Sequence, residues 1–65
     1  MLDLTKYLLD DNMIDFYSQN FTEDELVEFL AYCNKCGMNR EDIRELLMDY
    51  ILFIDSWGRW QEARN

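Results

Sequence analysis

The stretch Leu46-Leu47-Met48-Asp49-Tyr50-Ile51-Leu52-Phe53-Ile54 decides the fold of this chain, because Asp49 alone interrupts an otherwise apolar run. If the run is helical, its apolar side chains point in every direction, and such a helix needs cover all round. One face, at i, i+3 and i+4 spacing, would carry Ile43, Leu46, Leu47, Tyr50, Ile54 and Trp57. Met48 and Leu52 would lie on the opposite side, and a chain of 65 residues has little left to cover them. We therefore interpret that side as a contact surface for another protein.

Two helix starts precede this stretch. Thr22 and Asn39 are favourable N-cap residues, and each stands three residues before an acidic side chain, Glu25 and Asp42 respectively. This is the spacing of a capping box, in which both side chains satisfy backbone N–H groups at the start of a helix. Because Asp is shorter than Glu, we expect the second box to be the weaker one.

Between the two starts, Gly37 suits the left-handed residue that ends many helices. We expect one helix over about residues 23–36 and a second from Arg40 to about Ala63, in which Gly58 is the place for an end or a kink. The short connection favours an antiparallel αα-hairpin. The predicted fold is a single all-α domain over residues 1–65, a small helical bundle built on that hairpin. It adds an N-terminal helical segment and a long C-terminal helix.

The expected helices differ in length, at ~21 Å and ~36 Å for ~1.5 Å per residue, so the end of the second, with Trp57 and Trp60, would overhang the first. The N-terminal segment is the candidate to pack there. Its apolar residues, which favour a short helix, are Leu2, Leu4, Tyr7, Leu8 and Leu9. Asn12 is a candidate cap for a further helix. Over residues 13–20 helix is favoured over strand, since the polar–apolar alternation breaks down.

The formal net charge is −8, from 14 acidic and 6 basic residues, and Lys6 is the only basic side chain before position 31. A surface this negative repels phosphate, which argues against direct nucleic-acid binding and favours a partner protein with a basic or nucleic-acid-binding surface. No segment reaches the roughly 18 apolar residues of a membrane span. Asp3 and Asp10 interrupt the N-terminal apolar residues, so no secretory signal is indicated. We expect a cytoplasmic protein with reduced thiols and no membrane contact.

Catalytic and metal-binding patterns are weak. Residues 33–36 form a CxxC at the expected end of a helix, where the dipole raises the thiol pKa, whereas redox pairs occupy helix starts. A zinc site needs four ligands, and the chain has no His and no second cysteine pair. We interpret Cys33 and Cys36 as two buried small side chains. Without a phosphate loop or a nucleophile–base pair, we expect no enzyme activity, no metal and no cofactor.

Residues 23–30 (EDELVEFL) and 37–47 (GMNREDIRELL) together resemble the helical hairpin of the Sin anti-repressor family. In that family the hairpin inserts into the matching hairpin of a DNA-binding repressor and breaks the repressor dimer, so the resemblance implies an anti-repressor. The chain departs from the family pattern by lacking a Trp in the first helix, by its aromatic extension and by its additional N-terminal segment. The stretch is also similar to the helices of ribbon-helix-helix repressors. Those proteins need a basic strand before the first helix, and this chain has Asp15, Phe16 and Tyr17 there, without a Lys or Arg. We therefore do not expect DNA binding by that route.

The sequence favours a small acidic regulator that binds another protein by helix-in-groove packing and inhibits or remodels it. Small acidic helical chains of this kind suit phage-encoded inhibitors, by analogy of composition. One alternative is a DNA mimic that occupies the basic cleft of a nucleic-acid-binding protein, and another is a plain homodimerisation module. The expected partner-binding residues are Met48, Leu52, Phe53, Trp60, Asp10, Asp11, Asp15 and Glu28.

Overall fold

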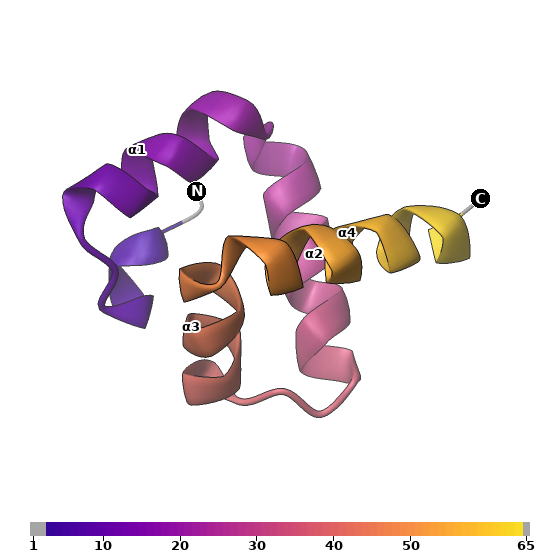
Figure 1. Ribbon diagram of the computed structural model, residues 1–65. Coiled ribbons are helices and arrows are strands. Elements are labelled where there is room, and N and C mark those ends of the chain that lie inside the picture. Colours follow the sequence, from indigo (N-terminus) through magenta and orange to yellow (C-terminus); the bar gives the residue numbers. More distant parts are fainter. Residues whose placement is uncertain (1–2, 65) are drawn as a thin grey trace.

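The structure is a computed structural model that describes residues 3–64, and all of its regular elements are helical (Figure 1). They are the 3-10 helix η1 (Leu4–Tyr7) and the α-helices α1 (Asp11–Asn20), α2 (Glu23–Lys35), α3 (Arg40–Met48) and α4 (Tyr50–Arg64). The all-α class is confirmed, and so is helix over strand for residues 13–20. Leu2, expected in the short N-terminal helix, lies outside the described residues.

Side chains start α2 and α3 as the capping patterns predict, but the relative quality of the two boxes is reversed. Thr22 Oγ1 accepts from the N–H of Glu25 (3.2 Å), and the Glu25 carboxylate accepts from the Thr22 hydroxyl (3.0 Å). In the second box Asn39 accepts from the N–H of Asp42 (2.9 Å) while Asp42 accepts from the N–H of Asn39 (3.2 Å). The expectation that the second box is the weaker one is wrong, because the shorter Asp carboxylate reaches the backbone directly.

The helix α1 begins one residue after Asp10, whose carboxylate accepts from the N–H of Met13 (2.8 Å). The expected cap, Asn12, instead lies inside the first turn of α1. Asp and Asn are equally favourable N-cap residues. The observed cap, Asp10, lies in the same polar cluster as Asn12, two residues earlier.

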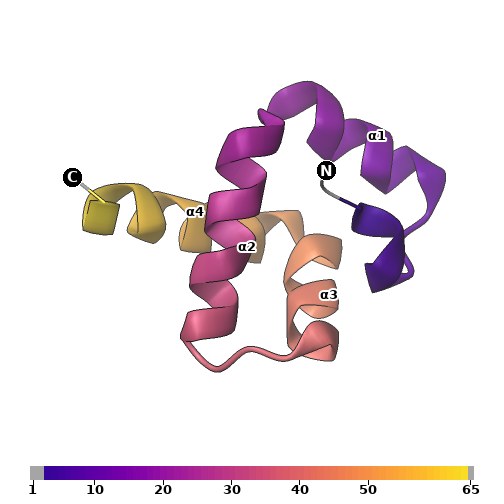
Figure 2. The ribbon, with the colours of Figure 1, turned by 180° about the vertical axis from the view of Figure 1, so that it is seen from behind.

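The turn after α2 follows the glycine signal. Gly37 has a φ of 94°, the N–H of Met38 donates to Cys33 O (3.1 Å) and the N–H of Gly37 donates to Asn34 O (3.1 Å). These two bonds form a Schellman motif, which satisfies carbonyls that the helix end would leave unpaired. The chain reverses there, and α3 runs antiparallel to α2 in both views (Figures 1 and 2). The hairpin is confirmed.

The expected continuous helix from Arg40 to about Ala63 is wrong, because it breaks at Asp49. That residue has an extended backbone (φ −109°, ψ 97°). Its N–H still donates to Glu45 O (3.1 Å), while its carboxylate accepts from the N–H of Leu52 (3.2 Å). Asp49 therefore ends α3 and caps α4, and α4 leaves in a new direction that crosses α2 (Figure 1). The long C-terminal helix exists, but it begins at Tyr50.

The break changes which side of the last helix faces the core. Tyr50 and Ile54, expected to continue the inner face of α3, are exposed, whereas Phe53 is fully buried. Gly58 neither ends nor kinks the helix, which runs on to Arg64. A helix interior tolerates a glycine at a cost of about 1 kcal/mol, and the packing of α4 on α2 offsets it.

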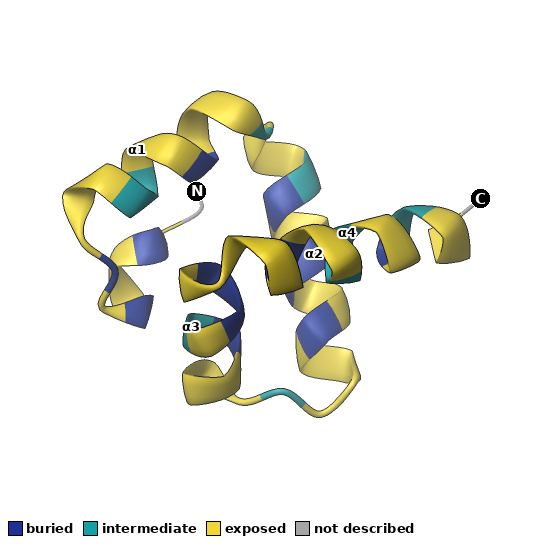
Figure 3. Ribbon diagram, in the orientation of Figure 1, coloured by how far each residue is buried: buried dark blue, intermediate teal, exposed yellow. Residues whose placement is uncertain are grey.

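One core holds the elements together, and its buried residues lie on inward faces of the helices (Figure 3). Its centre is aromatic: Phe53 lies 5.2 Å from Phe29 and 4.7 Å from Tyr17, measured between ring centroids. The buried set is Leu4, Tyr7, Leu9, Tyr17, Leu26, Phe29, Leu30, Cys33, Ile43, Leu46, Leu47, Phe53 and Trp60. The element η1 packs against α3, and not on an overhanging end of α4 as expected, because α4 turns away and packs on α2 instead.

Candidate protein-interaction surface

Apolar side chains are exposed where α3 meets α4. This α3–α4 corner consists of Met48, Tyr50, Ile51, Leu52 and Ile54. Ile51 is 83% exposed and Leu52 46% exposed, and the first turn of α4 shows as exposed ribbon in Figure 3. Single exposed apolar residues are ordinary, but a cluster of them marks a surface for contact. The predicted exposure of Met48 and Leu52 is confirmed.

The geometry of α4 explains this exposure. Residues on a helix are 100° apart, so the inward positions are three and four residues apart. Phe53, Trp57 and Trp60 take those positions and pack on α2, with Trp60 5.6 Å from Phe29 between ring centroids. The apolar residues before and after Phe53 cannot face the same way, and they remain in solvent.

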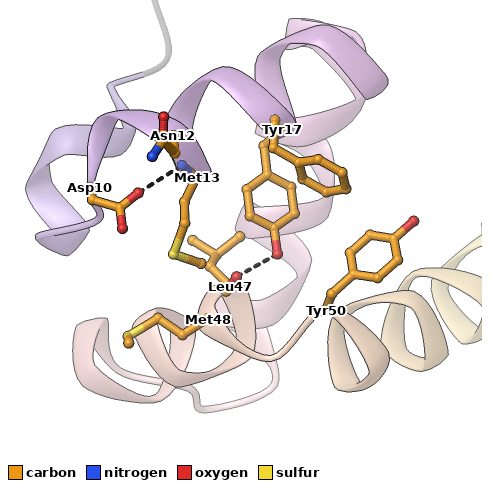
Figure 4. Close-up of a pocket in the computed structure, with 8 residues that line it drawn as sticks. Asp10, Asn12, Met13, Tyr17, Leu47, Met48 and Tyr50 are labelled. Atoms are coloured by element: carbon orange, nitrogen blue, oxygen red, sulfur yellow. Dashed lines mark hydrogen bonds between the residues drawn. The ribbon is translucent and has the colours of Figure 1, made fainter.

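A groove of about 440 Å³ adjoins the corner, between α1 and the α3–α4 junction (Figure 4). Most of its lining is apolar. Met13 and Phe16 come from α1, and Met48 and Tyr50 come from the corner. The remaining lining residues are Asp10, Asn12, Tyr17 and Leu47. Since Met48 and Tyr50 belong to both features, the α1 groove and the corner form one continuous apolar surface.

Tyr17 fixes the floor of the groove. Its hydroxyl donates a buried hydrogen bond to Leu47 O (Figure 4), a carbonyl in the last turn of α3 that lacks a helical partner. Burial, with smaller contributions from the charges of Tyr50 and Asp49, raises the pKa of Tyr17 to about 12. The phenol is therefore neutral at ordinary pH and remains a donor. This bond ties α1 to the point at which α3 ends.

The side chains that line the groove differ in stiffness. Phe16 meets Tyr50 edge to face, with ring centroids 5.0 Å apart, and Phe16 also packs on Tyr17 (5.3 Å). Met13 and Met48, in contrast, have flexible thioether side chains that adapt to different apolar shapes. The site thus combines a defined aromatic part with an adaptable one.

The predicted acidic site residues fall in two places. Asp10 lies at the mouth of the groove as the cap of α1, and Asp11 and Asp15 are exposed on α1. Glu28 lies on α2 and pairs with Arg64 of α4 at 3.5 Å, so the structure does not bring it to the groove. The carboxylates placed at the apolar surface are those of Asp10, which lines the groove, and Asp49 at the corner, whereas Asp11 and Asp15 are not among the groove-lining residues.

Two predicted contact residues are wrong. Phe53 is 0% exposed and Trp60 5% exposed, and both belong to the core. Their assignment to a partner surface assumed one helix from Arg40, and the cap at Asp49 rotates every later side chain relative to that assumption. Ile51, Phe16 and Met13 were missed for the related reason that their exposure depends on where α4 and α1 cross other elements. The signal that could have found Ile51 is Asp49 interpreted as an N-cap.

The cysteines contribute no site. Cys33 is buried, and burial, with the nearby Cys36 thiolate as a smaller cause, raises its pKa to about 11. Cys36 is exposed, so the expectation of two buried cysteines is wrong for it, because it follows the last turn of α2. Within residues 3–64, no group of three or more Cys, Asp or Glu side chains could hold a metal ion. No helix of the described part of the chain is long and apolar enough to cross a membrane.

Comparisons with protein-family models, curated proteins and solved structures find no match.

Proposed function

We propose that this chain is a small acidic regulatory protein that binds another protein through the α3–α4 corner and the α1 groove, and thereby inhibits or remodels it. An anti-repressor or a phage-type inhibitor acts in this way. The observation that carries the proposal is the exposure of five apolar residues between positions 48 and 54, continuous with an apolar groove. A core does not require these residues to be apolar, and an exposed patch of this kind lowers solubility unless a partner covers it.

The titratable groups at the groove support a binding role over a catalytic one. The carboxylate of Asp10 holds the start of α1, and the hydroxyl of Tyr17 holds the end of α3. Both groups stabilise helix ends, and a general acid or base needs a group free to exchange a proton with substrate. We place the interaction in the cytoplasm, where the free thiols of Cys33 and Cys36 persist.

A single substitution at the corner tests the proposal. Leu52→Asp puts a charge on the apolar surface, yet it leaves the helix start intact, because an acidic side chain in the first turn of a helix complements the helix dipole. Val27→Asp is the matched control, since Val27 is 45% exposed on α2 and Leu52 is 46% exposed. We expect immobilised wild type and Val27→Asp to capture the same proteins from a cell extract, identified by mass spectrometry, and Leu52→Asp to lose them.

Light scattering over a dilution series completes the test, and thermal unfolding checks that all three proteins are folded. We expect a monomer. A dimer that Leu52→Asp dissociates would replace the proposal with homodimerisation. Capture that survives Leu52→Asp but disappears at high salt would replace it with a DNA mimic, since screening weakens purely ionic contacts.

A further inference from the structure

The proposed function leaves open the chemistry of the partner, and the structure narrows it. Building on that function, we propose that the partner presents a basic amphipathic helix. One bulky apolar side chain of this helix enters the α1 groove, its neighbours lie on the α3–α4 corner, and its Lys or Arg side chains meet the carboxylates of Asp10 and Asp49. Three features support this occupant: the shape of the surface, its apolar lining and the charge along its edge.

The shape of the surface favours a helix as the occupant. A partner segment in extended conformation binds by adding to an exposed sheet edge, and residues 3–64 contain no strand that could offer one. The other common mode lays the apolar side of an amphipathic helix into a groove, with anchors at i, i+3, i+4 and i+7. The groove between α1 and the corner has the apolar walls that this mode needs.

The lining admits one deep anchor and several shallow contacts. Tyr17 and Leu47 are buried at the floor, so an entering side chain would meet packed, apolar atoms there. Met13 and Met48 at the sides can adjust to an aromatic or a branched aliphatic anchor. Ile51 and Leu52 follow the groove-lining Tyr50 in the first turn of α4 and are exposed, and they would contact the next turn of the partner helix.

The edge of the surface selects positive charge. Two carboxylates are placed at this surface: Asp10 lines the groove, and Asp49 lies in the chain between Met48 and Tyr50, which line the groove as well. None of the groove-lining residues is a Lys or Arg, and α1 contains none either. A partner with Lys or Arg on the sides of its apolar stripe is complementary to this edge, and the attraction also speeds encounter.

The same charges oppose a second copy of this chain as the occupant. A symmetric dimer brings the same patch of both copies together, so the Asp10 and Asp49 carboxylates of the two copies would approach each other. Each copy carries a net charge of −8, and long-range repulsion of that size slows and weakens self-association.

Designed peptides test the partner class directly. The probe is a fluorescein-labelled helical peptide with leucines at i, i+3, i+4 and i+7 and lysines on both sides of the leucine stripe. A glutamate-flanked peptide of the same pattern and a scrambled leucine–lysine peptide of the same composition serve as controls. Binding to the full chain is measured by fluorescence anisotropy from about 0.05 to about 0.5 M salt, where the Debye length falls from more than 10 Å to a few Å.

We expect the lysine-flanked helix to bind at least about tenfold more tightly than either control peptide. We expect Leu52→Asp to weaken it by about tenfold or more, because the new carboxylate would be buried against the leucine stripe of the peptide. Val27→Asp provides the matched control for added charge. The double variant Asp10→Asn/Asp49→Asn keeps both N-cap acceptors. It should weaken binding several-fold and flatten its salt dependence. Glu41→Gln/Glu62→Gln removes the same charge from other exposed positions and should leave both nearly unchanged.

Each of the other possible outcomes would overturn a stated part of the proposal. Equal binding of the glutamate-flanked helix, still abolished by Leu52→Asp, would refute the basic partner and keep the proposed function. Binding of all peptides that ignores Leu52→Asp would refute both. Equal binding of the scrambled peptide, or equal loss in the two charge variants, would show attraction to net charge without a seated helix. A dimer in light scattering that Leu52→Asp dissociates would assign the surface to a second copy.

Discussion

Tyr17 does more than fill space in the core, because its hydroxyl supplies the hydrogen bond that the last turn of α3 lacks. The donor and acceptor are thirty positions apart in the sequence, so the bond fastens α1 to the α3–α4 junction and shapes the floor of the α1 groove. This contact is where the chemistry of a single residue determines the geometry of the proposed binding surface.

Tyr17→Phe should therefore destabilise the fold. The substitution leaves Leu47 O buried without its donor, which costs about 1–3 kcal/mol. For a domain of this size each kcal/mol lowers the melting temperature by roughly 4–8 °C, which thermal unfolding followed by circular dichroism measures. Tyr50→Phe is the control, since Tyr50 is exposed, and it should change stability by less than about 0.5 kcal/mol. Equal losses in both variants would show that the Tyr17 bond adds nothing.

Alkaline pH should weaken the folded state through two residues. The folded-state pKa of Cys33 is raised to about 11 and that of Tyr17 to about 12. Both groups are neutral when protonated, and above their ordinary pKa the unfolded chain releases protons that the folded chain retains. Stability is thus fully present below about pH 9 and falls as pH rises to about 12. Urea unfolding over this range measures the decline.

Two variants assign the alkaline decline to its residues. Cys33→Ala should remove the part of the pH dependence between about pH 9 and 11, and Tyr17→Phe the part between about pH 10 and 12. If the stability of both variants falls with rising pH as steeply as that of the wild type, other groups cause the decline.

Helix ends determine the direction of each element, and Asp49 is the decisive one. Asp49→Ala removes the side chain that accepts from the N–H of Leu52, and loss of such a cap costs about 1 kcal/mol. Asp49→Asn keeps the acceptor and should stay near wild type. Asp55→Ala removes a carboxylate from the same helix that makes an exposed pair with Arg59 at 3.3 Å, and it should cost less than about 0.5 kcal/mol. An Asp49→Ala variant as stable as the wild type would show that a continuous helix is tolerated.

The two glycines should respond to alanine with opposite signs. Gly58 lies inside α4, where an added methyl group would meet no atom within 4 Å beyond its chain neighbours and the adjacent backbone of its own helix, whereas Gly37 has a φ of 94°. Gly58→Ala should stabilise the protein by about 0.5–1 kcal/mol through the lower entropy of the unfolded chain. Gly37→Ala should destabilise it by about 1–2 kcal/mol, the cost of a left-handed backbone. Chemical denaturation of both variants tests the pair, and a loss of stability in Gly58→Ala would contradict the open environment of that position.

At the scale of the whole molecule, charge acts against compactness. The chain carries −8, and the ion pairs Arg59–Asp55 and Arg64–Glu28 have exposed side chains that contribute little. Screening should relieve more repulsion than it removes attraction, so added sodium chloride should raise the melting temperature. Choline chloride at equal ionic strength should act similarly. A fall in melting temperature would show that attractive pairs dominate.

Local signals in the sequence determined several helix ends and the chain reversal of this protein. The Thr22 and Asn39 caps and the glycine at position 37 predict where α2 and α3 begin and where the chain reverses. These signals are reliable because each depends on hydrogen bonds within four or five residues. The apolar content of residues 46–54 likewise indicated an excess of exposed apolar surface, and Met48 and Leu52 are on it.

Tertiary structure alone decided the rest. Asp49 could be a solvated residue on one long helix or the cap of a new one, and the choice depends on Tyr17, which satisfies Leu47 O from another helix. Once the helix restarts, packing on α2 selects Phe53 and Trp60 for the core and leaves Ile51 in solvent. Periodicity within one segment cannot reveal that choice, since α4 is apolar on several sides. Which side is buried follows from the partner element that the fold brings to it.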